Sequence, residues 1–215
     1  MSATQGALQR WQRLIDQPLD FLGEQPLAAG FPESVGAARL AALRERPRFH
    51  SRLLRMVLDH HRLQDPSRLP SPDPDDLPVL LLPPNDFQRL PRLCGAILHG
   101  VTLSREIRGD VVSQWRELLG ADAFAVALAH RALGGAADLL RTPVELIEAI
   151  DQDGARCLST WLRTQPAQLR PWLHLRFAVP QDQDEPAVPT AVPNAAAIVR
   201  CAAASLHQPD EANAR

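Results

Sequence analysis

Short runs of apolar residues at helical spacing, separated by proline and glycine, most restrict how this chain of 215 residues can fold. The clearest run places apolar side chains at positions 90, 93, 94, 97, 98 and 101, which share one face of a helix. Proline lacks an amide hydrogen and fits only the first turn of a helix, so the 20 prolines divide the chain into short helices. The pattern predicts an all-α fold, an irregular helical domain with long proline-rich loops and at most one short strand pair.

The first part of the chain is expected to hold three helices. The first carries Leu8 and Trp11 and ends before Pro18, and residues 19–32 are predicted to form a loop. Ser34 is the expected cap of a second helix that runs to about residue 46. Pro47 suits the first turn of the third, whose inner face is formed by Phe49, Leu53, Leu54, Val57 and Leu58. The proline-rich and aspartate-rich residues 65–84 should form an extended surface loop.

Further helices are expected after this loop. One begins near Asn85 or Asp86 with Pro91 in its first turn, and another runs from Asp110 to Gly120. The alanine-rich residues 121–133 are apolar on most faces, so we expect them to form the most buried helix. A capping box, Thr142-Pro143-Val144-Glu145, opens the next helix. Apolar and other residues then alternate over 172–179, a period typical of a short strand.

These elements predict one helical domain over residues 1–178, a proline-rich linker over 179–193, and a C-terminal helix and tail over 194–215. The helix is placed from Asn194 to His207 because alanine favours helix. The acidic, proline-rich linker offers little apolar surface, so a chain that ends after Pro180 should still fold.

Charge and composition exclude several classes of protein. The net charge is −2, which argues against nucleic acid as a partner, and no run of 18 apolar residues predicts a membrane span. No signal peptide is visible at the N-terminus. Cys94, Cys157 and Cys201 are odd in number and far apart, which favours a reducing compartment over a disulfide framework. We therefore expect a cytoplasmic protein without direct membrane insertion.

No motif in the sequence predicts an enzyme, a cofactor or a metal site. Asp59-His60-His61 spells part of a two-metal phosphoesterase signature, but here it ends a helix and lacks further ligands. Asp151 and Asp153 do not fit a calcium loop and are expected to be solvated. Each of His99 and His130 is interpreted as a core residue satisfied by a backbone carbonyl. The tryptophans mostly fall on apolar stripes and should be core residues.

Basic residues concentrate on the third helix. All 23 basic residues of the chain are arginines, and seven of them lie between Arg39 and Arg62. Because the apolar stripe occupies the inner face, Arg48, Arg52 and Arg55 should lie outside. They could be an ordinary solvated face or a docking face for an acidic protein, because arginine pairs bidentately with carboxylates.

Three segments together resemble one family. They are the leucine-rich Arg92–Gly100 that ends in His-Gly, then Ala129–Gly134, and the Trp-Leu-His-Leu-Arg-Phe segment Trp172–Phe177. Their order and separation are similar to those of the K subunits of type III secretion systems (the YscK, PscK and SctK family). The N-terminal third of the chain carries no motif that matches this family.

The resemblance implies a non-catalytic scaffold without a cofactor. Members of this family join the pod protein of the cytoplasmic sorting platform (Q-type) to the cytoplasmic domain of the inner-membrane ring protein (D-type). Two alternatives stay open on the sequence. One is a generic cytoplasmic helical chaperone or regulator, and the other is a metal-dependent hydrolase that uses His60 and His61.

Overall fold

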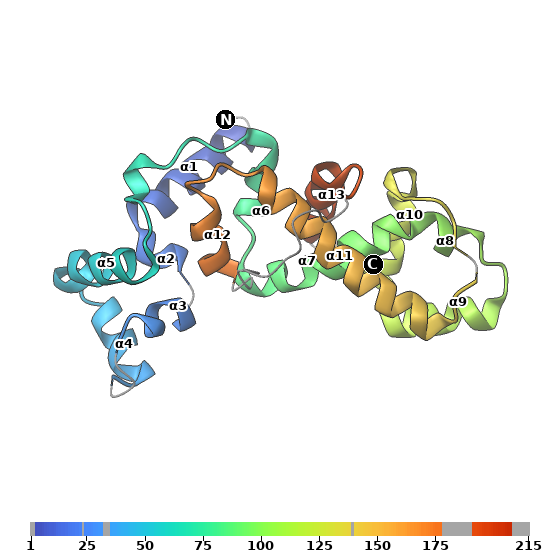
Figure 1. The fold of residues 1–215 in the computed structure, drawn as a ribbon, viewed down its shortest axis with the longest axis horizontal. Helices are drawn as coiled ribbons and strands as arrows, with labels where there is room; N and C mark the ends of the chain where they lie inside the picture. The colour runs from blue at the N-terminus through green and yellow to red at the C-terminus, as the bar shows by residue number, and fades with distance from the viewer. Residues whose placement is uncertain (1–2, 23, 32–34, 139, 178–190, 208–215) are drawn as a thin grey trace, which may run out of the picture. The chain divides into compact units, whose positions relative to one another are not determined.

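The computed structural model describes residues 3–22, 24–31, 35–138, 140–177 and 191–207 (Figure 1). Every regular element in these residues is a helix, so the chain is all-α as predicted. The chain forms two compact units, residues 1–84 with 165–185 and residues 85–164 with 186–215. The single domain expected over 1–178 stays a prediction, and most of the predicted linker, 179–193, lies outside the described residues.

The first unit is built from short helices that proline and glycine separate. They are α1 (Ala3–Asp16), α2 (Pro18–Phe21), α3 (Glu24–Ala29), α4 (Ala37–Arg44), α5 (Pro47–His61), the 3₁₀ turns η1 (Pro66–Arg68) and η2 (Pro74–Asp76), α6 (Leu77–Leu80) and α12 (Arg170–Phe177). Helix α1 packs on α2 and α6, while α5 packs on α2 and α4. The loop predicted over residues 19–32 is wrong, because α2 and α3 occupy it and bury Leu19, Leu22 and Leu27.

The cap of α4 also differs from the prediction. Gly36 holds the N-cap position with extended backbone and no side-chain hydrogen bond, and Ser34 lies outside the described residues. Pro47 does occupy the first turn of α5, as predicted. A proline at this position is tolerated because its missing amide hydrogen would have had no partner in the helix.

Residues 65–84 form two 3₁₀ turns and a short helix in place of the predicted extended surface loop. Asp65 accepts the N–H of Ser67 at 2.9 Å, and Asp73 accepts the N–H of Asp75 at 3.0 Å. These aspartates satisfy the turns locally, which lets the apolar residues that follow turn inward. The side chains that are at most 1% exposed here are Leu77, Val79, Leu80 and Leu82.

The strand predicted over residues 172–179 is a helix, α12, as far as residue 177. Its buried side chains are Trp172, Leu173, Arg176 and Phe177, a helical spacing that includes a charged residue. The indole of Trp172 donates to the carbonyl of Gln64 at 3.1 Å, and Arg176 Nη2 donates to the carbonyl of Leu82 at 3.0 Å. The alternation of apolar and other residues was misleading because it places Trp172 and Arg176 on the outer face. Both side chains are instead buried, with their polar atoms bonded to backbone carbonyls.

The second unit surrounds one long helix. Its elements are α7 (Pro84–Leu98), α8 (Gly100–Arg105), α9 (Gly109–Leu119), α10 (Ala121–Ala129), the 3₁₀ turn η3 (Arg131–Leu133), α11 (Pro143–Thr164) and α13 (Ala195–His207). Helix α11 packs against α9 and against α13 (Figure 1). The C-terminal helix expected over 194–207 is thus confirmed as α13.

Two glycines let α7 and α11 approach until their backbones touch. A Cβ on Gly95 would lie 1.8 Å from the carbonyl oxygen of Ile150, and one on Gly154 would lie 1.9 Å from that of Pro91. Pro91 lies inside α7, so the expectation that it occupies the first turn is wrong. Prolines inside helices persist where tertiary packing compensates for the lost hydrogen bond.

The start of α11 is as predicted, whereas the burial of α10 is not. The Thr142 Oγ1 and backbone N–H both donate to Glu145 Oε2 at 2.8 Å, and the Glu145 N–H returns to Thr142 Oγ1 at 3.4 Å. Helix α10 buries only Ala123, Phe124 and Ala127, so it is not the central helix. Its alanines are apolar but small, and several of them face solvent.

Candidate partner-binding surface

Three arginines form an exposed stripe along α5. Arg48, Arg52 and Arg55 are separated by four and three residues, which places them on one face of the helix, and all three are exposed. On the opposite face Leu53 is 3% exposed and Val57 is 0% exposed. The predicted division of α5 into an apolar inner face and a basic outer face is therefore confirmed. We call Arg48, Arg52 and Arg55 the arginine stripe; its proposed contact with a partner stays a prediction.

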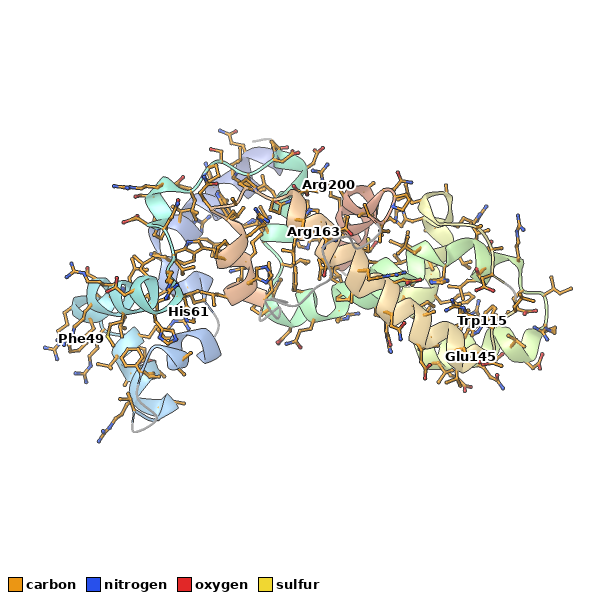
Figure 2. All side chains as sticks on the ribbon, viewed as in Figure 1. Phe49, His61, Trp115, Glu145, Arg163 and Arg200 are labelled. Carbon is orange, nitrogen blue, oxygen red and sulfur yellow. The ribbon has the colours of Figure 1, made fainter. Side chains whose placement is uncertain are left out.

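The charges of the arginine stripe are not neutralised within the described residues. No ion pair there involves any of the three, and the Arg48 guanidinium lies 4.7 Å from the centroid of the Phe49 ring. Phe49 and His61 mark the two ends of α5 in Figure 2. A row of free guanidinium groups on a rigid helix can accept carboxylates through paired N–H donors. The stripe can thus bind an acidic surface without breaking an internal bond.

An apolar groove lies between α3 and α4. Its volume is about 520 Å³, and its lining residues are Asp20, Leu27, Ala28, Ala37, Leu40, Ala41, Arg44 and Glu45. Leu27 and Leu40 are each 4% exposed and form the floor, while the alanines are exposed. Arg44 Nη2 and Asp20 Oδ1 are 3.6 Å apart at one edge. No motif in the sequence indicated this groove, because its walls come from separate helices.

The histidine pair at the end of α5 does not meet further ligands in the described part of the chain. The rings of His60 and His61 pack edge to face with centroids 4.6 Å apart. Among the described residues, no group of three or more His, Cys, Asp or Glu side chains is placed to hold a metal ion. A hydrolase that uses these two histidines would have to recruit a ligand from elsewhere.

His99 binds a carboxylate rather than the backbone carbonyl that was expected. Its Nε2 lies 2.9 Å from Asp153 Oδ2, with side chains 12% and 25% exposed. Asp153 also accepts from Arg156 on α11. His130 is only half-buried, so it is not a core residue either. His99 and Asp153 are tens of residues apart in sequence, so sequence spacing alone did not reveal their contact.

A second polar tie joins α7 to α11. Arg92 Nε and Nη2 donate to Asp151 Oδ1 and Oδ2 at 2.9 and 2.8 Å, and this hydrogen bonding raises the pKa of Arg92. The prediction that Asp151 and Asp153 are simply solvated is wrong. Both carboxylates lie within three residues of Gly154, where the two helices touch. The charged groups of this region therefore link α7 to α11 at the helix crossing.

The tryptophans and cysteines of the described residues are packing groups. Trp11, Trp115, Trp161 and Trp172 are at most 5% exposed, which confirms their predicted place in the core. Cys94 and Cys157 are buried free thiols, and burial raises the pKa of Cys94. A raised pKa keeps this thiol protonated and unreactive.

Two glycines in the segments that resemble the K subunits, Gly100 and Gly134, lie at close backbone contacts. A Cβ on Gly100 would lie 2.5 Å from the carbonyl oxygen of Ala127, and one on Gly134 would lie 2.8 Å from that of Leu98. The N–H of Gly135 donates to the same Leu98 carbonyl at 3.0 Å. The first two segments thus specify the contact between the end of α7, α8 and η3.

Comparison with known proteins supplies the family. Nodulation protein NolU of Rhizobium fredii and nodulation protein NolU of Sinorhizobium fredii (strain NBRC 101917 / NGR234) are each 30% identical to this chain over 162 residues. The alignment covers 75% of this chain and 72% of either relative. The chain belongs to the NolU family. No family model and no solved structure matches it.

Within this NolU-family chain, no described helix has both the length and the apolar character that crossing a membrane requires. Sequence reasoning found the arginine stripe through the amphipathic period of α5. It missed the groove and the two polar contacts between α7 or its C-terminal end and α11, which are Arg92 with Asp151 and His99 with Asp153. No local signal could have shown them, because Arg92 and Asp151 are 59 residues apart.

Proposed function

We propose that this NolU-family chain is a non-catalytic adaptor of a type III secretion cytoplasmic sorting platform. In this role it links the pod protein to the cytoplasmic domain of the inner-membrane ring protein. It would work in the cytoplasm, peripheral to the secretion apparatus. Two independent likenesses support the proposal: the three segments that resemble the K subunits, and the match to NolU over 162 residues.

The observation that carries the adaptor role is the arginine stripe. Three exposed guanidinium groups stand on one face of a helix without an ion pair in the described residues. Like charges on neighbouring turns repel one another mildly, so such a stripe gives the isolated chain no stability. An acidic partner would remove that repulsion and gain bidentate contacts that also accelerate association. The stripe is therefore the surface that we assign to the pod or ring protein.

The test reverses the three charges together. Arg48→Glu, Arg52→Glu and Arg55→Glu in one chain should weaken binding to the purified pod protein or ring domain about tenfold or more, because acidic surfaces would then face each other. Binding is measured at low and moderate salt by surface plasmon resonance. The helical circular dichroism spectrum and the melting temperature should change little, since all three side chains are exposed.

A matched control reverses three exposed arginines elsewhere. Arg10, Arg13 and Arg105 are exposed, and their reversal changes net charge by the same amount. This control should bind both proteins as the wild type does. If both triple variants weaken binding equally, the loss comes from the change in overall charge and not from the arginine stripe. If the wild-type chain binds neither protein, the adaptor role itself is wrong, and a general chaperone or regulator becomes the better reading.

A further inference from the structure

We infer that a groove between α1, α5 and residues 65–72 binds a segment of a partner protein that carries aliphatic side chains next to a lysine or arginine. The groove has a volume of about 490 Å³, and α1 packs on η1 beside it. Leu8, Ile15 and Leu54 line it and keep part of their surface exposed, and Leu8 is 40% exposed. Apolar surface that a groove leaves in water is stabilised when aliphatic side chains of a partner cover it.

The charged residues that line this groove are both carboxylates, Asp16 at the end of α1 and Asp65 just before η1. Among the described residues of its lining, none is arginine, lysine or histidine. Both carboxylates are exposed, and neither enters an ion pair in the described part of the chain. We call this surface the acidic groove. Its charge favours a cation on the segment that fills it.

Each carboxylate of the acidic groove keeps one oxygen available. Gln12 Nε2 donates to Asp16 Oδ1 at 3.0 Å, while the N–H and Oγ of Ser67 donate to Asp65 Oδ1 at 2.9 and 2.6 Å. No hydrogen bond among the described residues uses Oδ2 of either aspartate. The hydroxyl and then the backbone N–H of Ser67 lower the pKa of Asp65, which is therefore charged at neutral pH. A guanidinium or ammonium group can bind Oδ2 without breaking an internal bond.

The arginines nearest to these residues in sequence do not line the acidic groove. Arg13, Arg55 and Arg68 are exposed, and none of them is among its lining residues. The charge of Arg68 lowers the pKa of Asp65 less than either hydrogen bond from Ser67 does, and these two charged groups form no ion pair within the described residues. The carboxylates are therefore open to a cation from outside.

The acidic groove and the arginine stripe are separate surfaces of opposite charge. Both include α5, but at 3.6 residues per turn Leu54 lies roughly 100° or more around this helix from Arg48, Arg52 and Arg55. A chain that links two proteins needs two such surfaces, because one partner must not displace the other. The inference rests on the proposed function for the source of the segment, the pod or ring protein that does not occupy the stripe. The groove itself can be tested without either protein.

The first experiment uses peptides of no assumed origin. A display library of short random peptides is selected against the full chain, and we expect enrichment of aliphatic residues next to lysine or arginine. Asp16→Asn together with Asp65→Asn removes both charges and should weaken binding of these peptides about tenfold or more. Asparagine keeps the carbonyl oxygen that accepts from Gln12 and Ser67, so the helical spectrum should not change.

Asp59→Asn together with Glu117→Gln is the matched control, and peptides should bind it as they bind the wild type. Both residues are exposed and do not line the groove, and the double change removes the same amount of charge. Ser71→Trp is an independent variant, because Ser71 is an exposed lining residue and an indole there should also weaken binding. If no basic, aliphatic peptide is enriched, or if such peptides bind the chain with Asp16→Asn and Asp65→Asn at unchanged affinity, the inference is wrong.

The same variants, tested with the purified pod protein and ring domain, separate the two proposals. If charge reversal of the arginine stripe weakens binding of one partner and the double asparagine variant weakens binding of the other, both proposals are supported. If the asparagine variant binds both partners normally while the stripe reversal weakens binding, the adaptor role stands and the inference fails. If basic peptides lose affinity for the asparagine variant but neither protein binds the wild type, the groove is supported and the adaptor role fails.

Discussion

Glycine at four positions marks where backbones of the second unit touch. Gly95 and Gly154 lie at the crossing of α7 with α11, while Gly100 and Gly134 lie between α7, α8, α10 and η3. At each position a methyl group would come within 3 Å of a carbonyl oxygen of another element. These residues are needed for close approach and not for unusual backbone angles, since their φ values are not positive.

We expect Gly154→Ala to destabilise the chain by roughly 2 kcal/mol or more, because overpacking of this kind costs about 1–3 kcal/mol. The new Cβ would lie 1.9 Å from the Pro91 carbonyl oxygen, which belongs to a helix backbone and cannot yield as a side chain could. Urea unfolding followed by circular dichroism measures the effect. Gly6→Ala is the control, because nothing lies within 4 Å of its Cβ position in α1. It should leave stability unchanged or raise it slightly.

Helix α11 organises its unit, and its first turn is fixed by local chemistry. Thr142 and Glu145 bond to each other on both backbone and side-chain atoms, and Pro143 occupies the first helical position. The backbone N–H and then the hydroxyl of Thr142 lower the pKa of Glu145. The cap therefore stabilises the folded chain above the ordinary pKa of glutamate, and this contribution is lost as the pH falls through the lowered value.

Thr142→Ala should lower the melting temperature at pH 7 by about 3 °C, a shift that corresponds to the loss of a typical N-cap. Thr142→Ser retains the hydroxyl, so its melting temperature should be close to that of the wild type. Because protonated Glu145 no longer favours the reciprocal bonds, the difference between wild type and Thr142→Ala should narrow below the pKa of Glu145. Differential scanning calorimetry from pH 7 downward through the lowered pKa of Glu145 checks this, and a difference that stays unchanged once Glu145 is protonated would contradict the role given to the carboxylate.

Across the whole molecule, residues near the C-terminus complete a core that begins more than a hundred positions earlier. Helix α13 packs along α11 and buries Ala195, Ile198, Val199, Ala202 and Ala203. Cys157 Sγ on α11 lies 3.7 Å from the carbonyl oxygen of Ala195. The expectation that a chain ending after Pro180 still folds stays a prediction, and the packing of α13 argues against it, since that chain would lack α13. Its loss would expose the apolar face of α11.

Ile198→Ala should destabilise the second unit by about 2–5 kcal/mol, the usual cost of an Ile→Ala cavity. Ile198 is 0% exposed, whereas Leu140 is 96% exposed, so Leu140→Ala serves as a control that should change stability by less than about 0.5 kcal/mol. Chemical denaturation measures both. The chain truncated after Pro180 should lose at least as much as Ile198→Ala. If the truncated and full chains are equally stable, α13 contributes nothing to the free energy of unfolding.

The sequence by itself determined the features that depend on neighbouring residues. Apolar residues at helical spacing, prolines in first turns and the capping box placed α5, α9 and α11, and alanine content placed α13. The helical period of α5 also located the arginine stripe. These predictions succeed because each depends on atoms within about one or two turns of one another. The stripe was also predictable because charge cannot share a helix face with an apolar core.

Only the tertiary structure decided what depends on residues far apart in the chain. Residues 172–177 are helical because Trp172 and Arg176 find carbonyl oxygens at Gln64 and Leu82, which no local pattern shows. Likewise Asp151 is a partner of Arg92, and the groove exists because α3 and α4 meet with small side chains between them. Burial makes each such polar contact obligatory, since an unpaired buried donor costs free energy, and its partner is set by the packing of distant segments.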